Sequence, residues 1–225
     1  MIALVRYELA LLARSQRWIP PLVLYVLGVV GLGGTSGGSH PQSVGEALRW
    51  SALMLVPVVA WLTRSALTGE PDAARACVAA AAGPRRAQVA ALTAALAAGM
   101  VIAVAGIAWA MTLGAWGKDW LAGLGFGLGA VITCLLVGSA VGTACNPPLI
   151  RRPGMAMLST AVLAILALES GASPANAAVT VAGGGVPGMP GHGWPIGLPL
   201  AAAVGLAAAA WTVSARAAAR RSGGG

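Results

Sequence analysis

Few side chains in this sequence could carry out a reaction or hold a nucleotide. No phosphate-binding loop of the G-x-x-x-x-G-K-[ST] type occurs, because the one lysine, Lys118, is followed by aspartate. His40 and His192 both fall in segments expected on the outer side of a membrane, without further metal ligands. Ser139 lies in an apolar run with no histidine at the same depth to act as its base. We therefore predict that the chain is not an enzyme and holds no cofactor or metal of its own.

The cysteines and the charges exclude two further kinds of chemistry. Cys77, Cys134 and Cys145 are odd in number and show no C-x-x-C spacing, which argues against structural disulfides. No acidic or basic residue falls at the centre of an expected membrane span. That pattern argues against a proton-coupled transporter or pump, which needs ionisable groups within the membrane.

The most informative polar segment lies between the second and third apolar runs. Pro71 fits the first position of a helix, and Glu70 and Asp72 complement the helix dipole there. Gly83 and Pro84 end the helix after an alanine-rich stretch of about ten residues. This short helix either docks to a protein partner, since its small side chains permit close approach, or belongs to a loop that is merely helical.

The composition identifies the elements that carry these residues. Of the 225 residues, 58% are hydrophobic and 9% are charged, with a mean hydropathy of +0.81, whereas soluble domains carry about 25% charged residues. The chain is therefore predicted to be an all-α, polytopic membrane protein. Spans of about 20 residues use more than half the chain, so any large soluble machinery must come from a partner. The net charge of +8 does not indicate nucleic acid, because the basic residues occur in small groups between apolar runs.

Six transmembrane helices are predicted from the apolar runs, within a single domain of residues 1–225. They lie within residues 18–34, 46–67, 87–117, 120–143, 153–168 and 196–214. The uncharged part of the second run, Trp50 to Thr63, has 14 residues and spans about 21 Å of a hydrocarbon core of about 30 Å. Arg49 and Arg64 must therefore extend toward opposite membrane surfaces.

The basic residues orient these spans. With both termini inside, twelve of the fourteen lie on the cytoplasmic side: Arg6, Arg14, Arg17, Arg64, Arg75, Arg85, Arg86, Arg151, Arg152, Arg216, Arg220 and Arg221. Only Arg49 and Lys118 lie outside. Because cytoplasmic loops are enriched in basic residues, we expect a multi-pass protein of the inner (plasma) membrane with both termini in the cytoplasm.

Residues 1–17 read as an interfacial amphipathic helix. Apolar side chains recur at helical spacing at Ile2, Val5, Leu9 and Leu12. Arg6, Arg14 and Arg17 mark the polar side, which would face anionic lipid head groups. Pro20 and Pro21 are expected to break this helix from the first span.

Glu8 is the acidic residue of this segment. If the segment were instead the first turns of a long span, Glu8 and Arg14 would lie at membrane depth, which is costly. Glu8 also lacks a basic residue three or four positions downstream. We therefore predict an ion pair between segments, with Arg64 or Arg86.

Two further segments have features of interest. The fourth span carries two G-x-x-x-G pairs, Gly123/Gly127 and Gly138/Gly142, which favour close helix packing within the subunit over a dimer seam. Residues 169–195, before the last span, are long and nearly uncharged. They either form an apolar re-entrant hairpin covered by protein or a disordered glycine-rich connector.

Two stretches resemble a known family. Val5 to Pro21 resembles the start of small actinobacterial permease subunits of ATP-binding-cassette transporters of the type-2 exporter class. Leu67 to Arg86, with its Gly69-Glu70-Pro71-Asp72 and Ala82-Gly83-Pro84-Arg85-Arg86 strings, looks like the first cytoplasmic loop of the same subfamily. The two matches cover about forty residues directly, and the six-span layout is similar along the rest.

The resemblance implies a division of labour. An interfacial helix would lead into the first span, a coupling helix between spans two and three would dock in a groove on a separate ATPase subunit, and a re-entrant segment would cover the outer exit. The implied partners are that ATPase, which would bind ATP and Mg, a second permease as a homo- or heterodimer, and membrane lipid, but no nucleic acid. The short outer loops favour an amphiphilic or apolar cargo.

The same resemblance implies which residues couple the two subunits. The coupling candidates are Glu70, Pro71, Asp72 and Arg75, with Pro84, Arg85 and Arg86 at the hinge and Arg151 and Arg152 as secondary contacts. Arg6, Glu8, Arg14 and Arg17 belong to the interfacial helix. The competing hypothesis is a polytopic membrane protein that moves no cargo, such as an immunity or sensor-associated subunit.

Overall fold

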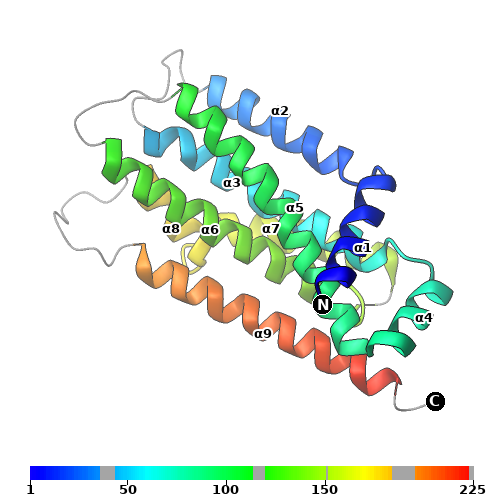
Figure 1. Ribbon diagram of the computed structural model, residues 1–225. Helices are drawn as coiled ribbons and strands as arrows, with labels where there is room; N and C mark the ends of the chain where they lie inside the picture. The colour runs from blue at the N-terminus through cyan, green and yellow to red at the C-terminus, as the bar shows by residue number, and fades with distance from the viewer. Residues whose placement is uncertain (36–43, 114–119, 151, 184–195, 223–225) are drawn as a thin grey trace.

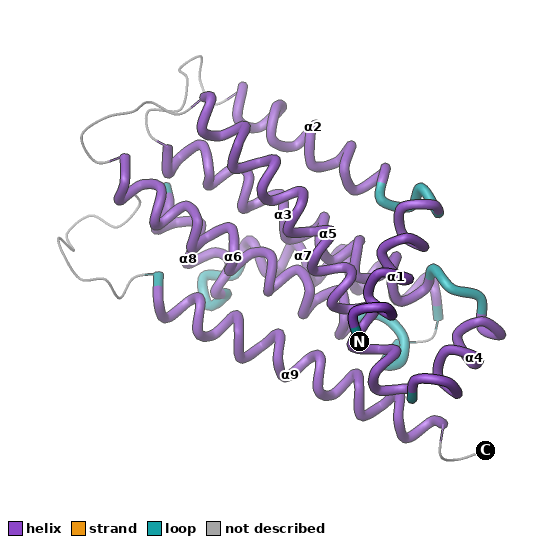
Figure 2. The backbone as a smooth tube through the Cα atoms, viewed as in Figure 1, coloured by secondary structure: helices purple, strands orange, loops and turns teal. Residues whose placement is uncertain are grey.

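The computed structural model describes residues 1–35, 44–113, 120–150, 152–183 and 196–222. Within these residues the chain is helical and has no strand (Figure 2). The helices are α1 (Ile2–Arg14), α2 (Ile19–Thr35), α3 (Val44–Thr68), α4 (Asp72–Ala82), α5 (Pro84–Leu113), α6 (Trp120–Ala144), α7 (Pro153–Glu169), α8 (Pro174–Ala182) and α9 (Gly197–Ser222). The predicted all-α class is confirmed.

The long helices form a bundle around α3. This helix packs against α2, α5, α6, α7 and α8, and α9 completes the bundle against α5 and α6. Figure 1 shows α1 and α4 together at one end of the bundle, where both chain termini also lie. Most of α3 is buried, because apolar residues occur on all sides of it, as expected for a helix enclosed by other helices.

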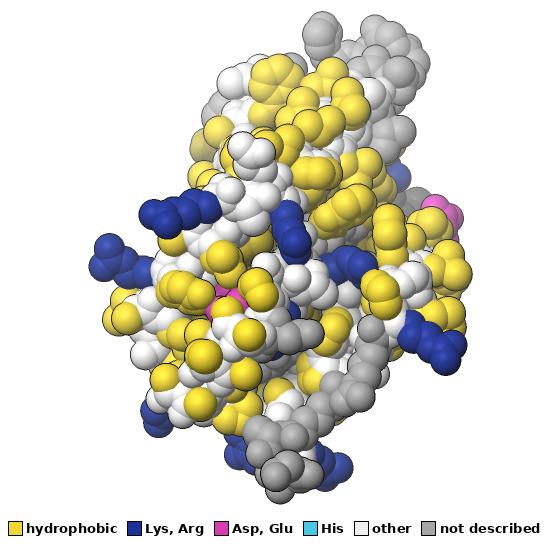
Figure 3. All heavy atoms as spheres, turned by 90° about the vertical axis from the view of Figure 1, so that its right-hand side faces the viewer, with side chains coloured by type: hydrophobic (Ala, Val, Ile, Leu, Met, Phe, Trp, Pro, Cys, Tyr) yellow, Lys and Arg dark blue, Asp and Glu magenta, His cyan; other side chains and the backbone are white. Residues whose placement is uncertain are grey.

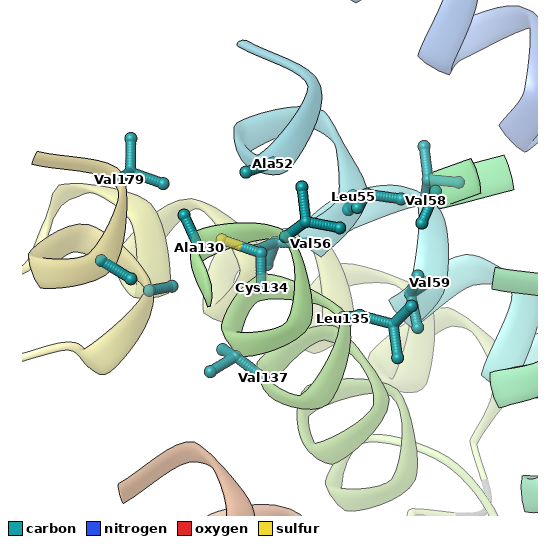
Figure 4. Close-up of a cluster of buried hydrophobic side chains, with 14 of the residues drawn as sticks. Ala52, Leu55, Val56, Val58, Val59, Ala130, Cys134, Leu135, Val137 and Val179 are labelled. Atoms are coloured by element: carbon teal, nitrogen blue, oxygen red, sulfur yellow. The ribbon is translucent and has the colours of Figure 1, made fainter. Parts of the chain in front are cut away.

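The contact between α3 and α6 forms the centre of the core. Figure 4 shows Leu55, Val56 and Val59 of α3 facing Cys134 and Leu135 of α6. The helices approach closely because α6 presents glycines here. A Cβ atom on Gly138 or Gly142 would lie 2.7 Å from a backbone oxygen of α3. The prediction that these glycines pack within the subunit is confirmed.

The structure supports fewer membrane spans than the sequence analysis predicted. Among the described residues, α3, α5, α6 and α9 are each long and apolar enough to cross a membrane. The pair α7 and α8, bent by 47°, makes a fifth if it is counted as one broken span. Helix α2, predicted as the first span, has 17 residues and measures about 25 Å, less than the hydrocarbon core of about 30 Å. The described residues therefore give four to five candidate spans, and the predicted six are not confirmed.

The junction between α1 and α2 also differs from the prediction. The break falls before Pro20 and Pro21, since α1 ends at Arg14 and α2 begins at Ile19. The two prolines lie in the first turn of α2, where a missing backbone N–H costs no hydrogen bond. The chain turns at Gln16, which has a φ of 54°.

The segment predicted before the last span begins with a helix. Helix α8 buries Ala175, Ala178 and Val179 in the core, so this apolar stretch is covered by protein, as expected. Its bend from α7 is that of a broken span or a re-entrant loop. Residues 184–195 of the predicted segment lie outside the described residues.

Candidate partner-docking site

Helix α4 is the predicted short helix, and local signals define both its ends. It begins at Asp72 directly after Pro71, which occupies the cap position, one residue before the position predicted for it. It ends at Gly83, whose φ of 86° favours glycine, and Pro84 then starts α5. The side chain of Asp72 lies outside the described part of the structure.

Helix α4 stands away from the bundle (Figure 1) and packs against α5. One side of it is exposed, and the exposed side chains are all small: Ala73, Ala76, Cys77, Ala80 and Ala81. Small side chains let another backbone approach closely. The exposed face of α4 is therefore suited to contact with a partner.

A polar cluster connects α1 to the segment that leads into α4. The Tyr7 hydroxyl of α1 donates to Glu70 Oε1 over 2.9 Å. Arg75 Nη2 of α4 donates to the Glu70 carbonyl oxygen over 3.0 Å. The hydrogen bond from Tyr7 to Glu70 is the main reason that the pKa of Tyr7 is raised. Glu70, predicted as a coupling residue, thus links α1, the end of α3 and α4.

Glu8 is the buried acid of this region. Its side chain is only 4% exposed, and burial, followed by the nearby charge of Glu70, raises its pKa to about 7. The opposing positive charge is that of Arg75, not Arg64 or Arg86 as predicted. Arg64 instead donates to Asn146 Oδ1 over 3.2 Å and to a backbone oxygen over 3.3 Å.

A cavity of about 340 Å³ lies between α4 and the bundle. Five helices and the linkers beside them contribute its lining, which we name the α4 pocket. Its residues are Glu8, Ala66, Leu67, Glu70, Arg75, Ala76, Ala79, Pro84, Ala87, Gln88, Ala91, Pro147, Pro148 and Ala218. Its polar groups are therefore two carboxylates, one guanidinium and one amide, between small apolar walls.

The surroundings of the α4 pocket are basic. Figure 3 views this end of the molecule and shows basic side chains scattered over the face, with small acidic patches among hydrophobic side chains. Arg6, Arg14, Arg85 and Arg86 are exposed. Such an arrangement attracts an acidic partner surface from a distance.

The remaining predicted residues are distributed around this end. Arg17 donates to the carbonyl oxygen of Thr68 over 3.0 Å, which joins the α1–α2 linker to the end of α3. Arg152 is exposed just before α7 and does not line the α4 pocket. Arg151 lies outside the described residues.

Sequence reasoning missed several residues of the site. Tyr7 was not singled out, although it precedes Glu8. Gln88 donates to Ser214 Oγ over 2.8 Å and so ties α5 to α9 beneath the pocket. Asn146 accepts a hydrogen bond from Arg64 at its Oδ1 atom and donates one from Nδ2 to the Gly142 carbonyl oxygen. The position of Asn146 before two prolines was its only local signal.

Comparison with known proteins finds no matching family model, no matching curated protein and no matching solved structure. The resemblance to exporter permeases thus depends on the quoted residues alone and stays a prediction. Within the described residues, no group of three or more His, Cys, Asp or Glu side chains could hold a metal ion.

Proposed function

We propose that this chain is the transmembrane subunit of an ATP-binding-cassette exporter and that a separate ATPase subunit docks on α4. The observation that carries the proposal is the exposed helix α4, which stands off the bundle at the end where both termini lie (Figure 1). Polar contacts connect α4 to the segment after α3 and to α1, so a partner that shifts α4 would also shift these elements. ATP and Mg would bind to the ATPase, since this chain has no nucleotide-binding motif.

Coupling follows from the contacts of α4. A shift of α4 moves Arg75 and therefore the Glu70 carbonyl oxygen to which it donates. Glu70 continues directly from α3, the central helix of the bundle, and its carboxylate holds Tyr7 of α1. Closure of the ATPase would thus rotate α3 against its neighbours, as expected for alternating access by rigid movements of packed helices.

An apolar groove supports an amphiphilic or apolar cargo. The groove measures about 310 Å³ and lies between α2, α3 and α7. Leu24, Trp61 and Ile165 are among its lining residues, and Arg64 is the charged residue among them. A second permease facing this groove would enclose the path. In this proposal the protein spans the plasma membrane with both termini in the cytoplasm, where the ATPase is found.

The proposal is tested by purification from native membranes. A tagged wild-type chain is expected to copurify with an ATPase in near-equal amounts, and the complex is expected to hydrolyse ATP. Ala80→Trp places a large side chain on the exposed face of α4 and should abolish copurification. Ala208→Trp makes the same change at an exposed position of α9 and should leave it unchanged.

Two outcomes contradict the proposal. One is a wild-type chain that purifies without any nucleotide-hydrolysing subunit. The other is an Ala80→Trp complex with wild-type composition and hydrolysis. Either result would favour the membrane protein without transport activity.

A further inference from the structure

The α4 pocket contains a buried carboxylate, that of Glu8, which the positive charge of Arg75 opposes only in part, since its pKa is still raised. The side chain of Glu8 is only 4% exposed and lines the pocket. Among the described residues, neither of its carboxylate oxygens receives a hydrogen bond. The other polar groups of the pocket have partners, since Glu70 accepts from Tyr7 and Gln88 donates to Ser214.

A buried carboxylate without a hydrogen bond is costly unless a ligand compensates for it. Burial of a polar group without a hydrogen bond raises the free energy of the folded chain. A partner that forms the missing hydrogen bond removes this cost, and a partner of opposite charge forms the strongest bond. The cavity of about 340 Å³ exceeds the volume of one water molecule, about 30 Å³, by roughly tenfold. There is room for a whole side chain beside Glu8.

We propose that the α4 pocket receives a lysine or arginine side chain of the ATPase subunit, which pairs with the carboxylate of Glu8. This inference rests on the proposed function and adds the chemistry of the contact. Charge favours a cation, because the pocket has two carboxylates, from Glu8 and Glu70, and one guanidinium, from Arg75. The aliphatic stem of a basic side chain matches the alanine and proline walls.

The position of the pocket explains why a partner side chain is the occupant. The walls include Ala76 and Ala79 of α4 and Pro147 and Pro148 of the α6–α7 linker, so the cavity is bordered by the helix on which the ATPase docks. A side chain inserted here would contact α1 and α4 together. It would fix the register of docking, while the surrounding arginines guide a mainly acidic partner surface.

The first test asks whether ATPase binding requires the negative charge of Glu8 or only the shape of its side chain. Glu8→Gln keeps the shape and removes the charge, and Glu169→Gln removes the charge of an acid exposed at the end of α7. Complexes are purified from native membranes and the ATPase is quantified against the chain over a salt series. We expect Glu8→Gln to lower the retained ATPase at least tenfold and Glu169→Gln to match the wild type. Equal retention by Glu8→Gln and the wild type would overturn the proposal.

A second test is independent of any loss of affinity. In a Cys77→Ala background, which removes the exposed native thiol, the variant Ala87→Cys places a thiol on the wall of the α4 pocket and keeps Glu8. It is treated with the cationic reagent 2-(trimethylammonium)ethyl methanethiosulfonate. Labelling of position 87 should be at least tenfold slower in the ATPase complex than in the isolated chain. An equal rate in both would overturn the proposal, because it would show an unoccupied pocket in the complex.

Failure of the proposed function would look different. In that case the wild-type chain itself would bring down no ATPase, before any variant is considered. If the wild-type complex forms but position 87 is not protected and Glu8 is not required, only the occupant of the α4 pocket is wrong.

Discussion

The close contact between α3 and α6 makes a quantitative prediction about glycine. In Gly142→Ala the new Cβ atom would lie 2.7 Å from the carbonyl oxygen of Ala60, whereas ordinary van der Waals contacts begin at 3.4 Å. The nearest atom is Thr63 Cβ, at 2.6 Å, so the helices must separate by about 0.8 Å to reach 3.4 Å. Gly125, in the same helix, has no atom within 4 Å of such a Cβ atom.

The comparison of the two variants isolates the cost of the clash. Both gain the same helix propensity of about 1 kcal/mol, so this contribution cancels in the difference. Overpacking against a backbone atom costs about 1–3 kcal/mol, and Gly142→Ala should be less stable than Gly125→Ala by that amount. The assay is reversible unfolding in mixed micelles, followed by helical circular dichroism. Equal unfolding free energies for the two variants would refute the close packing of α3 on α6.

Two other residues make predictions about stability in the same assay. The native pKa of Glu8 is raised to about 7 from 4.5, so stability should be highest below pH 4.5 and fall by up to about 3 kcal/mol as the pH rises to 7. Glu8→Gln should remove this slope and be the more stable protein at pH 8; a slope that persists in the variant would show that another group titrates. Arg64→Ala removes the donor to Asn146 and should cost about 1–3 kcal/mol, with partial recovery in Arg64→Lys. No loss in the alanine variant would mean that this contact does not hold α3 to the α6–α7 linker.

Elements with local signals were predicted from the sequence. Helix α4 has a proline before its first residue and a glycine of positive φ after its last, and both act within a few residues of the helix end. The internal packing of Gly138 and Gly142 was also predicted, since small residues four apart favour a close helix contact. These features depend on residues adjacent in the chain or on one helix face.

Features that depend on distant residues were not predicted. The turn at Gln16 has a φ of 54°, but the residue there is not a glycine, so the sequence does not predict a positive φ at this position. The charge nearest Glu8 was assigned to Arg64 or Arg86, whereas Arg75 supplies it.

The α4 pocket shows the same limit. Gln88 and Ser214 meet over 126 positions of sequence, and the pocket walls come from segments throughout the chain. The sequence identified Glu70 and Arg75 as polar residues of one loop. It could not show that Tyr7 holds Glu70 in place, because that contact requires α1 to fold against the end of α3.

The most direct measurement is the subunit composition of the tagged chain purified from its native membrane in mild detergent. Mass spectrometry with intensity-based quantification should detect one nucleotide-hydrolysing subunit per copy of this chain, lost when Ala80 is replaced by tryptophan. A preparation that contains the chain in its folded form and no such subunit would contradict the claim that a separate ATPase drives it.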